Sequence, residues 1–139
     1  MDALHASFAA RIENLAAMLD FIESGVPALQ LPATLGSKLL LIAEELFTNT
    51  TRHGGVEACA LPISLSLSRS GDEVALTFED SGSAYNPFEN LNVDALEIPV
   101  SDRPIGRLGL ILVSTMATRV SYERKGQRNC TGVWLHCPA

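Results

Sequence analysis

What this sequence lacks excludes several classes of protein. Only 10 of its 139 residues are Lys or Arg, against 16 Asp or Glu, and the net charge of -6 offers no basic surface for nucleic acid. No apolar run approaches the ~20 residues that a membrane-spanning helix needs, and no basic region followed by an apolar block opens the chain. We therefore expect a cytoplasmic protein that binds neither nucleic acid nor membrane. A nucleotide ligand stays open, because local arginines or backbone amides can hold phosphate on an acidic protein.

Cysteine is also scarce. Cys59, Cys130 and Cys137 are odd in number and have no CxxC spacing, which argues against both a zinc site and a disulfide framework. The charged fraction of 19% and the hydrophobic fraction of 47% are typical of a chain that folds. We expect a single domain over residues 1–139 with a sizeable core.

The first half of the chain predicts one strand and two helices. Loose alternation over residues 4–8 favours a short strand. Apolar residues at helical spacing over 11–22 predict an amphipathic helix that ends at Gly25, with 26–31 as a connection. After Pro32 a second apolar stripe predicts a helix that continues toward Gly54 and Gly55.

In the second half the apolar period changes from helical to alternating. Residues 61–68 and 74–78 alternate around a Ser-Gly-Asp turn at 70–72 and predict an antiparallel hairpin. Residues 83–104 show little periodicity, which is typical of a functional loop or lid. A helix over 106–116 and strands over 120–124 and 130–137 follow. This order predicts an α+β two-layer sandwich, with helices on one face of a mainly antiparallel mixed sheet.

One face of the second helix carries the first chemical signal. Glu45 and Asn49 are four residues apart, so their side chains emerge one turn above the other. A carboxylate can accept a proton and an amide oxygen can bind a hard cation such as Mg²⁺. By itself this spacing is more often a solvated helix face.

Two further motifs follow along the chain. Asp80-x-Gly82 ends a strand, where the carboxylate can accept a hydrogen bond from an exocyclic amine, although a plain strand-ending turn is the commoner reading. Gly106-x-x-Gly109 opens a helix whose free amides suit phosphate, and Arg103 and Arg107 could add charge-assisted contacts. The alternatives are a plain helix start and solvated arginines.

Taken in order, these motifs resemble the N, G1 and G2 boxes of the Bergerat-type ATP-binding fold. Residues 44–54, 103–113 and 120–124, followed by Asn129, are similar in wording and order to the small single-domain branch, the anti-sigma-factor serine/threonine kinases. The resemblance covers about residues 4–136. Three ordered motifs with matching intervening elements are far more specific than any one of them.

The resemblance implies a role for each motif. Glu45 would be the general base that activates a serine or threonine hydroxyl, and Asn49 would coordinate Mg²⁺ that bridges the phosphates of ATP. Asp80 would bind the adenine amino group, with Gly82 giving the ring room. The lid over the phosphates would comprise Arg103, Gly106, Arg107, Leu108, Gly109 and Leu110. The reaction would be in-line γ-phosphoryl transfer.

Four positions depart from the family pattern, one of them around Ala117 and Thr118, where the Asp usually found just before the penultimate strand is replaced. Ala84 replaces a frequent second glycine, Asn86 replaces a carboxylate, and Arg107 stands where relatives commonly have glycine. The departures leave the primary ATP ligands intact and bear on lid closure and turnover.

The expected function is therefore an ATP-dependent serine/threonine kinase that phosphorylates an anti-anti-sigma-like protein. A sigma factor could be a second partner, and relatives commonly form homodimers. The alternative is an ATP-binding partner-switch module that regulates by binding without significant phosphotransfer. Glu45 separates the two, since only a kinase needs it.

Overall fold

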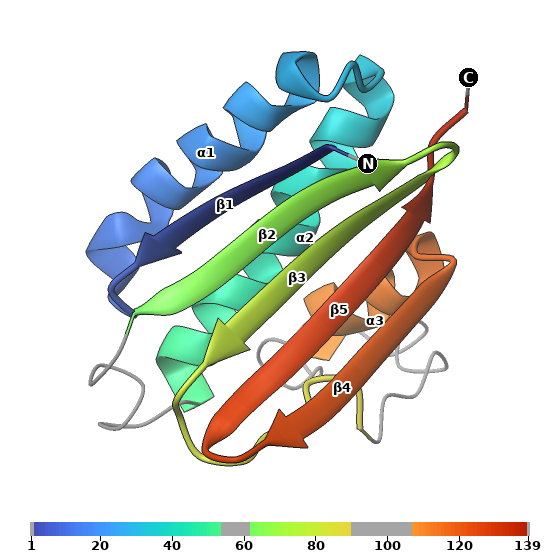
Figure 1. The fold of residues 1–139 in the computed structure, drawn as a ribbon. Helices are drawn as coiled ribbons and strands as arrows, with labels where there is room; N and C mark the ends of the chain where they lie inside the picture. Colours follow the sequence, from blue (N-terminus) through green and yellow to red (C-terminus); the bar gives the residue numbers. More distant parts are fainter. Residues whose placement is uncertain (1, 54–61, 90–106, 139) are drawn as a thin grey trace.

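The computed structural model describes residues 2–53, 62–89 and 107–138, which form two layers (Figure 1). The described strands are β1 (Asp2–Phe8), β2 (Ile63–Ser70), β3 (Glu73–Asp80), β4 (Arg119–Lys125) and β5 (Arg128–His136). They lie in the order β1-β2-β3-β5-β4, and each of the four neighbouring pairs is antiparallel. The helices α1 (Leu15–Ala28), α2 (Ala33–His53) and α3 (Arg107–Met116) lie behind one face of this sheet in Figure 1. The predicted α+β two-layer sandwich is confirmed.

The predicted hairpin is the β2–β3 pair. Ile63, Leu65 and Leu67 are buried on the helix side of β2, while the serines between them lie on the other face. Gly71 at the tip has a φ of 63°, a conformation that glycine adopts without steric cost. The period-2 pattern therefore fixes which face of the sheet the helices cover.

The predicted end of the first helix is wrong. A short 3-10 turn, η1 (Ile12–Asn14), precedes α1, and α1 continues through Gly25 and Pro27 to Ala28. Gly25 is not a helix end: a Cβ there would meet Leu67 Cδ2 at 2.7 Å, so the glycine lets the helix approach the sheet. The chain leaves the helix at Gln30, whose φ of 55° is left-handed, and Leu31 N–H donates to Val26 C=O at 2.8 Å. This is a Schellman end with Gln in the place usually taken by Gly.

Helix α2 is held against the sheet by its apolar stripe. Leu39, Ile42 and Phe47 have no exposed surface, and neither do Leu67 and Leu76 on the strands that they face in the common core. Burial on this scale contributes roughly 1.5–3 kcal/mol for each large side chain. The polar residues beside the stripe are thereby held at a fixed orientation over β3.

Some of the remaining predictions can be compared with the structure, and others fall on residues that it does not describe. Strands β4 and β5 and helix α3 begin and end within a few residues of the predicted positions. Residues 83–89 have no helix or strand, as predicted, whereas Gly54, Gly55, Leu61 and the rest of the predicted loop, 90–104, lie outside the described residues. None of the helices in the described part of the chain is long and apolar enough to cross a membrane.

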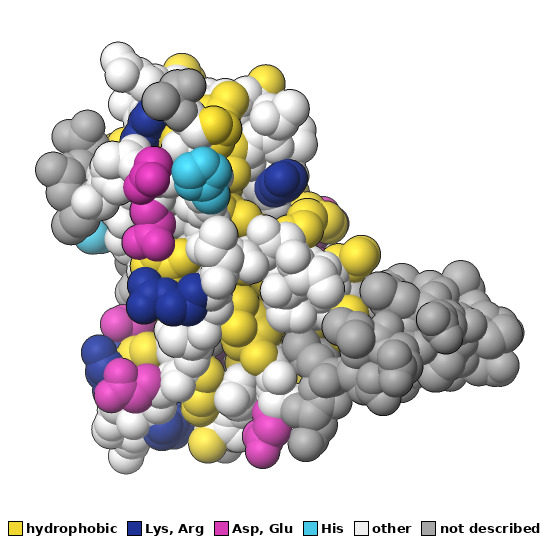
Figure 2. Space-filling model, turned by 90° about the vertical axis from the view of Figure 1, so that its right-hand side faces the viewer, with side chains coloured by type: hydrophobic (Ala, Val, Ile, Leu, Met, Phe, Trp, Pro, Cys, Tyr) yellow, Lys and Arg dark blue, Asp and Glu magenta, His cyan; other side chains and the backbone are white. Residues whose placement is uncertain are grey.

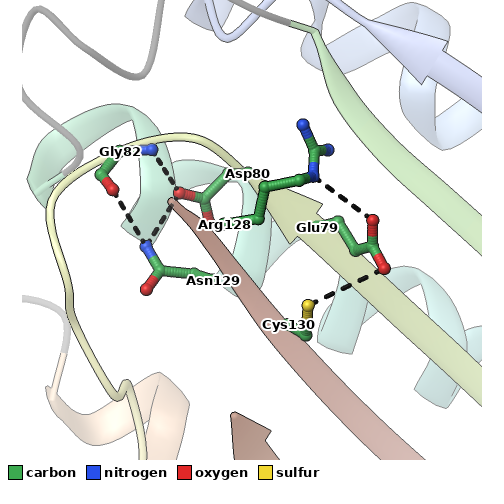
Figure 3. A network of polar contacts seen from close by, with 6 residues as sticks. All are labelled: Glu79, Asp80, Gly82, Arg128, Asn129 and Cys130. Carbon is green, nitrogen blue, oxygen red and sulfur yellow. Dashed lines mark hydrogen bonds and ion pairs between the residues drawn. The ribbon is translucent and has the colours of Figure 1, made fainter. Parts of the chain in front are cut away.

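The sheet face opposite the helices is polar. Trp134 lies on it and is half-buried, with the Arg119 guanidinium carbon 3.9 Å from the centre of its ring. Charged side chains of both signs gather on the sheet side of the molecule in the edge-on view of Figure 2. Cys130 and Cys137 are free thiols. Cys130 shares the polar face, and its thiol donates a weak hydrogen bond to Glu79 at 3.7 Å (Figure 3).

Candidate nucleotide site

Asp80 stands at the end of β3 and is almost fully buried, with 7% of its surface exposed. Its Oδ1 accepts the Gly82 N–H at 2.9 Å and the Asn129 Nδ2–H at 3.0 Å (Figure 3). No hydrogen bond among the described residues uses the other carboxylate oxygen, Oδ2. The carboxylate is thus anchored through one oxygen and keeps an acceptor for a ligand.

A narrow pocket opens beside this carboxylate. Its free space is about 20 Å³, enough for a single water molecule and smaller than an adenine ring. Helix α2 supplies one wall and the ends of β3 and β5 supply another. The lining residues are Leu46, Asn49, Thr50, Phe78, Asp80, Ser83, Tyr85, Pro87, Asn129 and Thr131.

Asn49 links the predicted N box to this pocket. Only 5% of its surface is exposed, and its carboxamide makes no hydrogen bond within the described part of the chain. Its carboxamide keeps contact with the pocket's solvent, because no fully buried side-chain nitrogen or oxygen among the described residues lacks a hydrogen-bond partner. Asn49 and Asp80, which are 31 residues apart in sequence, both line this cavity.

Glu45 lies one helical turn before Asn49 and is half-buried. Burial, and then the neighbouring Glu44 carboxylate, raise the pKa of Glu45 above its ordinary 4.5, against a smaller lowering by Arg52. A carboxylate with a raised pKa is a better proton acceptor than a fully solvated one. Glu44 itself is exposed, in keeping with a position about 100° further around the helix.

The Glu45 carboxylate contacts Gly109 in the first turn of α3. A Cβ built on Gly109 would lie well inside 3.0 Å of three atoms of that carboxyl group, Oε2, Cδ and Oε1. The absence of a side chain at residue 109 is therefore what gives the carboxylate its place. The first motif is therefore close to both of the others: Asn49 shares the pocket with Asp80 of the second motif, and Glu45 contacts Gly109 of the third.

The structure describes the other predicted lid residues to different extents. Leu110 is buried, with 1% exposed, and packs in the core rather than facing the pocket. Arg107 and Leu108 are the first two residues of α3, of which only the backbone is described. Arg103 and Gly106 lie outside the described residues, so their predicted contacts to phosphate stay predictions.

Sequence reasoning missed part of the pocket. Thr50, Tyr85 and Thr131 line it without a signal of their own, and the sequence indicates Asn129 only through the family resemblance. Thr50 follows Asn49 in the predicted helix, and this adjacency is the feature of the sequence that could have indicated its place in the pocket. For Thr131 the strand alternation predicts which face it occupies, but no local pattern indicates that this face lies beside Asp80.

Comparison with known proteins identifies the family of this chain. A family model described as the histidine kinase-like ATPase domain matches residues 8–135. The chain belongs to this family. It is 35% identical over 75 residues to the sensor histidine kinase LnrJ of Bacillus subtilis, a match over 54% of the chain and 17% of that protein. The matched segment thus spans about a sixth of the length of LnrJ.

Solved structures show the same fold at low identity. The SiaB–SiaC complex from Pseudomonas aeruginosa matches with a TM-score of 0.62 and 11% identity, over 95% of this chain and 88% of that one. The histidine kinase AdeS of Acinetobacter baumannii matches with a TM-score of 0.53 and 12% identity, over 100% of this chain and 70% of that one. Family membership implies that this domain binds ATP, and the pocket beside Asp80 contains Asn49 of the first motif and Asp80 of the second.

Proposed function

We propose that this ATPase domain is a serine/threonine protein kinase of the anti-sigma-factor type, which transfers the γ-phosphoryl group of ATP to an anti-anti-sigma-like protein. The observation that carries the proposal is the placement of Glu45. Its half-buried carboxylate lies one turn from the pocket residue Asn49 and against the start of α3. Binding a nucleotide alone does not require a proton acceptor there.

The nucleotide is held by the two ends of the pocket. The free Oδ2 of Asp80 accepts a hydrogen bond from the exocyclic amine of adenine, and Gly82 lets the backbone turn close to the ring. We assign the lid over the phosphates to Arg103, Gly106, Arg107, Leu108 and Gly109, with the buried Leu110 seating its helix in the core.

Mg²⁺ fits the residues at the other end of the pocket. The Asn49 oxygen is free of described partners, and Mg²⁺ in nucleotide sites commonly has one or two protein ligands, with phosphate oxygens and water completing the shell. Asn49 would hold the ion, which neutralises charge on the phosphates when bound. Among the described residues, no three His, Cys, Asp or Glu side chains are placed so that they could hold a metal ion by themselves.

The chemical step needs little covalent work from the protein. The substrate hydroxyl oxygen attacks the γ-phosphorus, the bond to the β–γ bridging oxygen breaks, and ADP leaves. Glu45 accepts the hydroxyl proton, and the raised pKa of this carboxylate suits that task. Positioning of the hydroxyl in line with the leaving group supplies much of the rate.

A protein substrate is consistent with the arrangement of one structural relative, which was solved as a complex of two proteins. Release or capture of a sigma factor on phosphorylation of that substrate, and homodimerisation of the kinase, complete the proposed partner-switch. The whole chain, 1–139, would act as one domain.

Incubation with γ-labelled ATP, Mg²⁺ and the protein that co-purifies with the tagged chain tests this function. We expect label in the partner on serine or threonine, and loss of that label in Glu45→Ala with ATP affinity retained. Glu44→Ala is the matched control, because it removes the adjacent exposed carboxylate and should keep transfer. ATP binding without transfer to the partner would refute the kinase and support the binding module.

A further inference from the structure

Asn129 occupies a central position behind the candidate adenine-binding carboxylate. In the sheet it is paired with Asp80 on β3 and with Arg124 on β4. Directly opposed residues of an antiparallel pair bring their side chains into contact. Only 3% of Asn129 is exposed, so its carboxamide is satisfied by protein groups.

The oxygen of the Asn129 carboxamide faces donors only. It accepts the Tyr122 hydroxyl at 2.5 Å, Arg124 Nη1–H at 3.0 Å and the Tyr85 backbone N–H at 3.3 Å. The guanidinium and the backbone amide cannot accept a hydrogen bond. These partners leave the carboxamide one orientation, with its oxygen toward β4 and its nitrogen toward β3.

The nitrogen of the carboxamide consequently faces acceptors. Nδ2 donates to Asp80 Oδ1 at 3.0 Å and to the Ser83 carbonyl at 2.8 Å (Figure 3 shows the bond to Asp80). Arg124 also donates to the Gly82 carbonyl at 2.8 Å, which fixes the peptide between Gly82 and Ser83. The Asp80 carboxylate is therefore held from behind through Oδ1 and presents Oδ2 to the ligand.

We infer that Asn129, oriented by Tyr122 and Arg124, is a positioning residue that makes Asp80 selective for a purine with an exocyclic amine. This inference rests on the proposed nucleotide site. An acceptor-only oxygen favours the amine of adenine and disfavours the carbonyl that guanine carries at the same place. Without Asn129, Asp80 keeps the Gly82 bond but can rotate, so its contribution to the base amine falls.

The measurement is a selectivity ratio: the Kd of purine riboside triphosphate, which lacks the amine, divided by the Kd of ATP. A hydrogen bond to a charged group predicts a ratio of about tenfold or more in the wild type. Asn129→Leu should lower the ratio several-fold toward one. Tyr122→Phe, which removes a single hydroxyl, should lower it part of the way. A purely structural defect would weaken both nucleotides equally and leave the ratio unchanged.

Cys130→Ala is the matched control. Cys130 is next to Asn129 in sequence but lies on the opposite face of β5, so this variant should keep the wild-type ratio. A wild-type ratio in Asn129→Leu overturns the inference. If that variant does not fold, a wild-type ratio in Tyr122→Phe overturns it. Failure of the wild-type chain to bind ATP refutes the proposed site itself, and the inference with it.

Discussion

Gly109→Ala tests the contact between the first and third motifs most sharply. The added methyl group would occupy the place of the Glu45 carboxylate, which must shift by roughly 1 Å or more to restore an ordinary contact. A displacement of about 1 Å in a reacting group can reduce a rate by about 10²-fold. We therefore expect phosphotransfer in the proposed kinase to fall on the order of 100-fold.

The same substitution should leave folding and ATP binding nearly intact. The group displaced is the end of a flexible, half-buried side chain, and Ala is favoured over Gly inside a helix by about 1 kcal/mol. The stability change is thus expected to be within about 1 kcal/mol. Asp80 and Asn49 are untouched, so the Kd of ATP should change by less than about threefold.

Three assays separate these effects: denaturant unfolding, calorimetric ATP titration and initial rates of label transfer to the partner. Thr115→Ala, an exposed position on the same helix, is the control and should behave as the wild type in all three. A wild-type transfer rate in Gly109→Ala would refute the role of Glu45 at this position. Loss of folding would refute the assignment of the contact to a side-chain end.

Further predictions concern the core, the base and the polar face of the sheet. Phe47→Ala, at a position with no exposed surface, should lower the free energy of unfolding by about 3–5 kcal/mol in a denaturant titration. The rate of transfer should fall on acidification, with a midpoint at a pH above 4.5. Glu44→Gln should move that midpoint to lower pH, because the Glu44 charge helps to raise the pKa of Glu45. An unmoved midpoint would count against Glu45 as the group that titrates. Cys130 should react with iodoacetamide more slowly at pH 8 than a small-molecule thiol, because burial and Glu79 raise the pKa of its thiol; a rate equal to that of free cysteine would contradict this.

Local patterns predicted most of the fold because each one has a local physical cause. Alternation in β2 and β3 reflects burial of one face, and the glycine at residue 71 supplies the turn between them. The end of α1 was missed because Gln30, rather than a glycine, takes the left-handed position. Gly25 carried the misleading signal, since its small size serves packing against Leu67.

The site residues that belong to a family motif were predictable from the sequence. The contacts that depend on the register between paired strands were not. Glu45, Asn49 and Asp80 belong to ordered motifs. By contrast, the hydrogen bond from Asn129 to Asp80 joins residues 49 apart, and it exists because β5 pairs with β3 in one particular register. Tyr122 and Arg124 reach Asn129 through a second pairing on β4. Two strand registers have to be known before those four side chains can be placed together.

The central claim is that the pocket beside Asp80 is the ATP site. Calorimetric titration of Mg·ATP into the wild type and into Asp80→Asn tests it most directly, because that substitution keeps the size of the side chain and replaces one acceptor oxygen by a donor group. We predict saturable binding by the wild type and at least a tenfold weaker Kd in the variant, with the unfolding transition of both proteins still cooperative. Equal affinity of the two proteins for ATP would contradict the account.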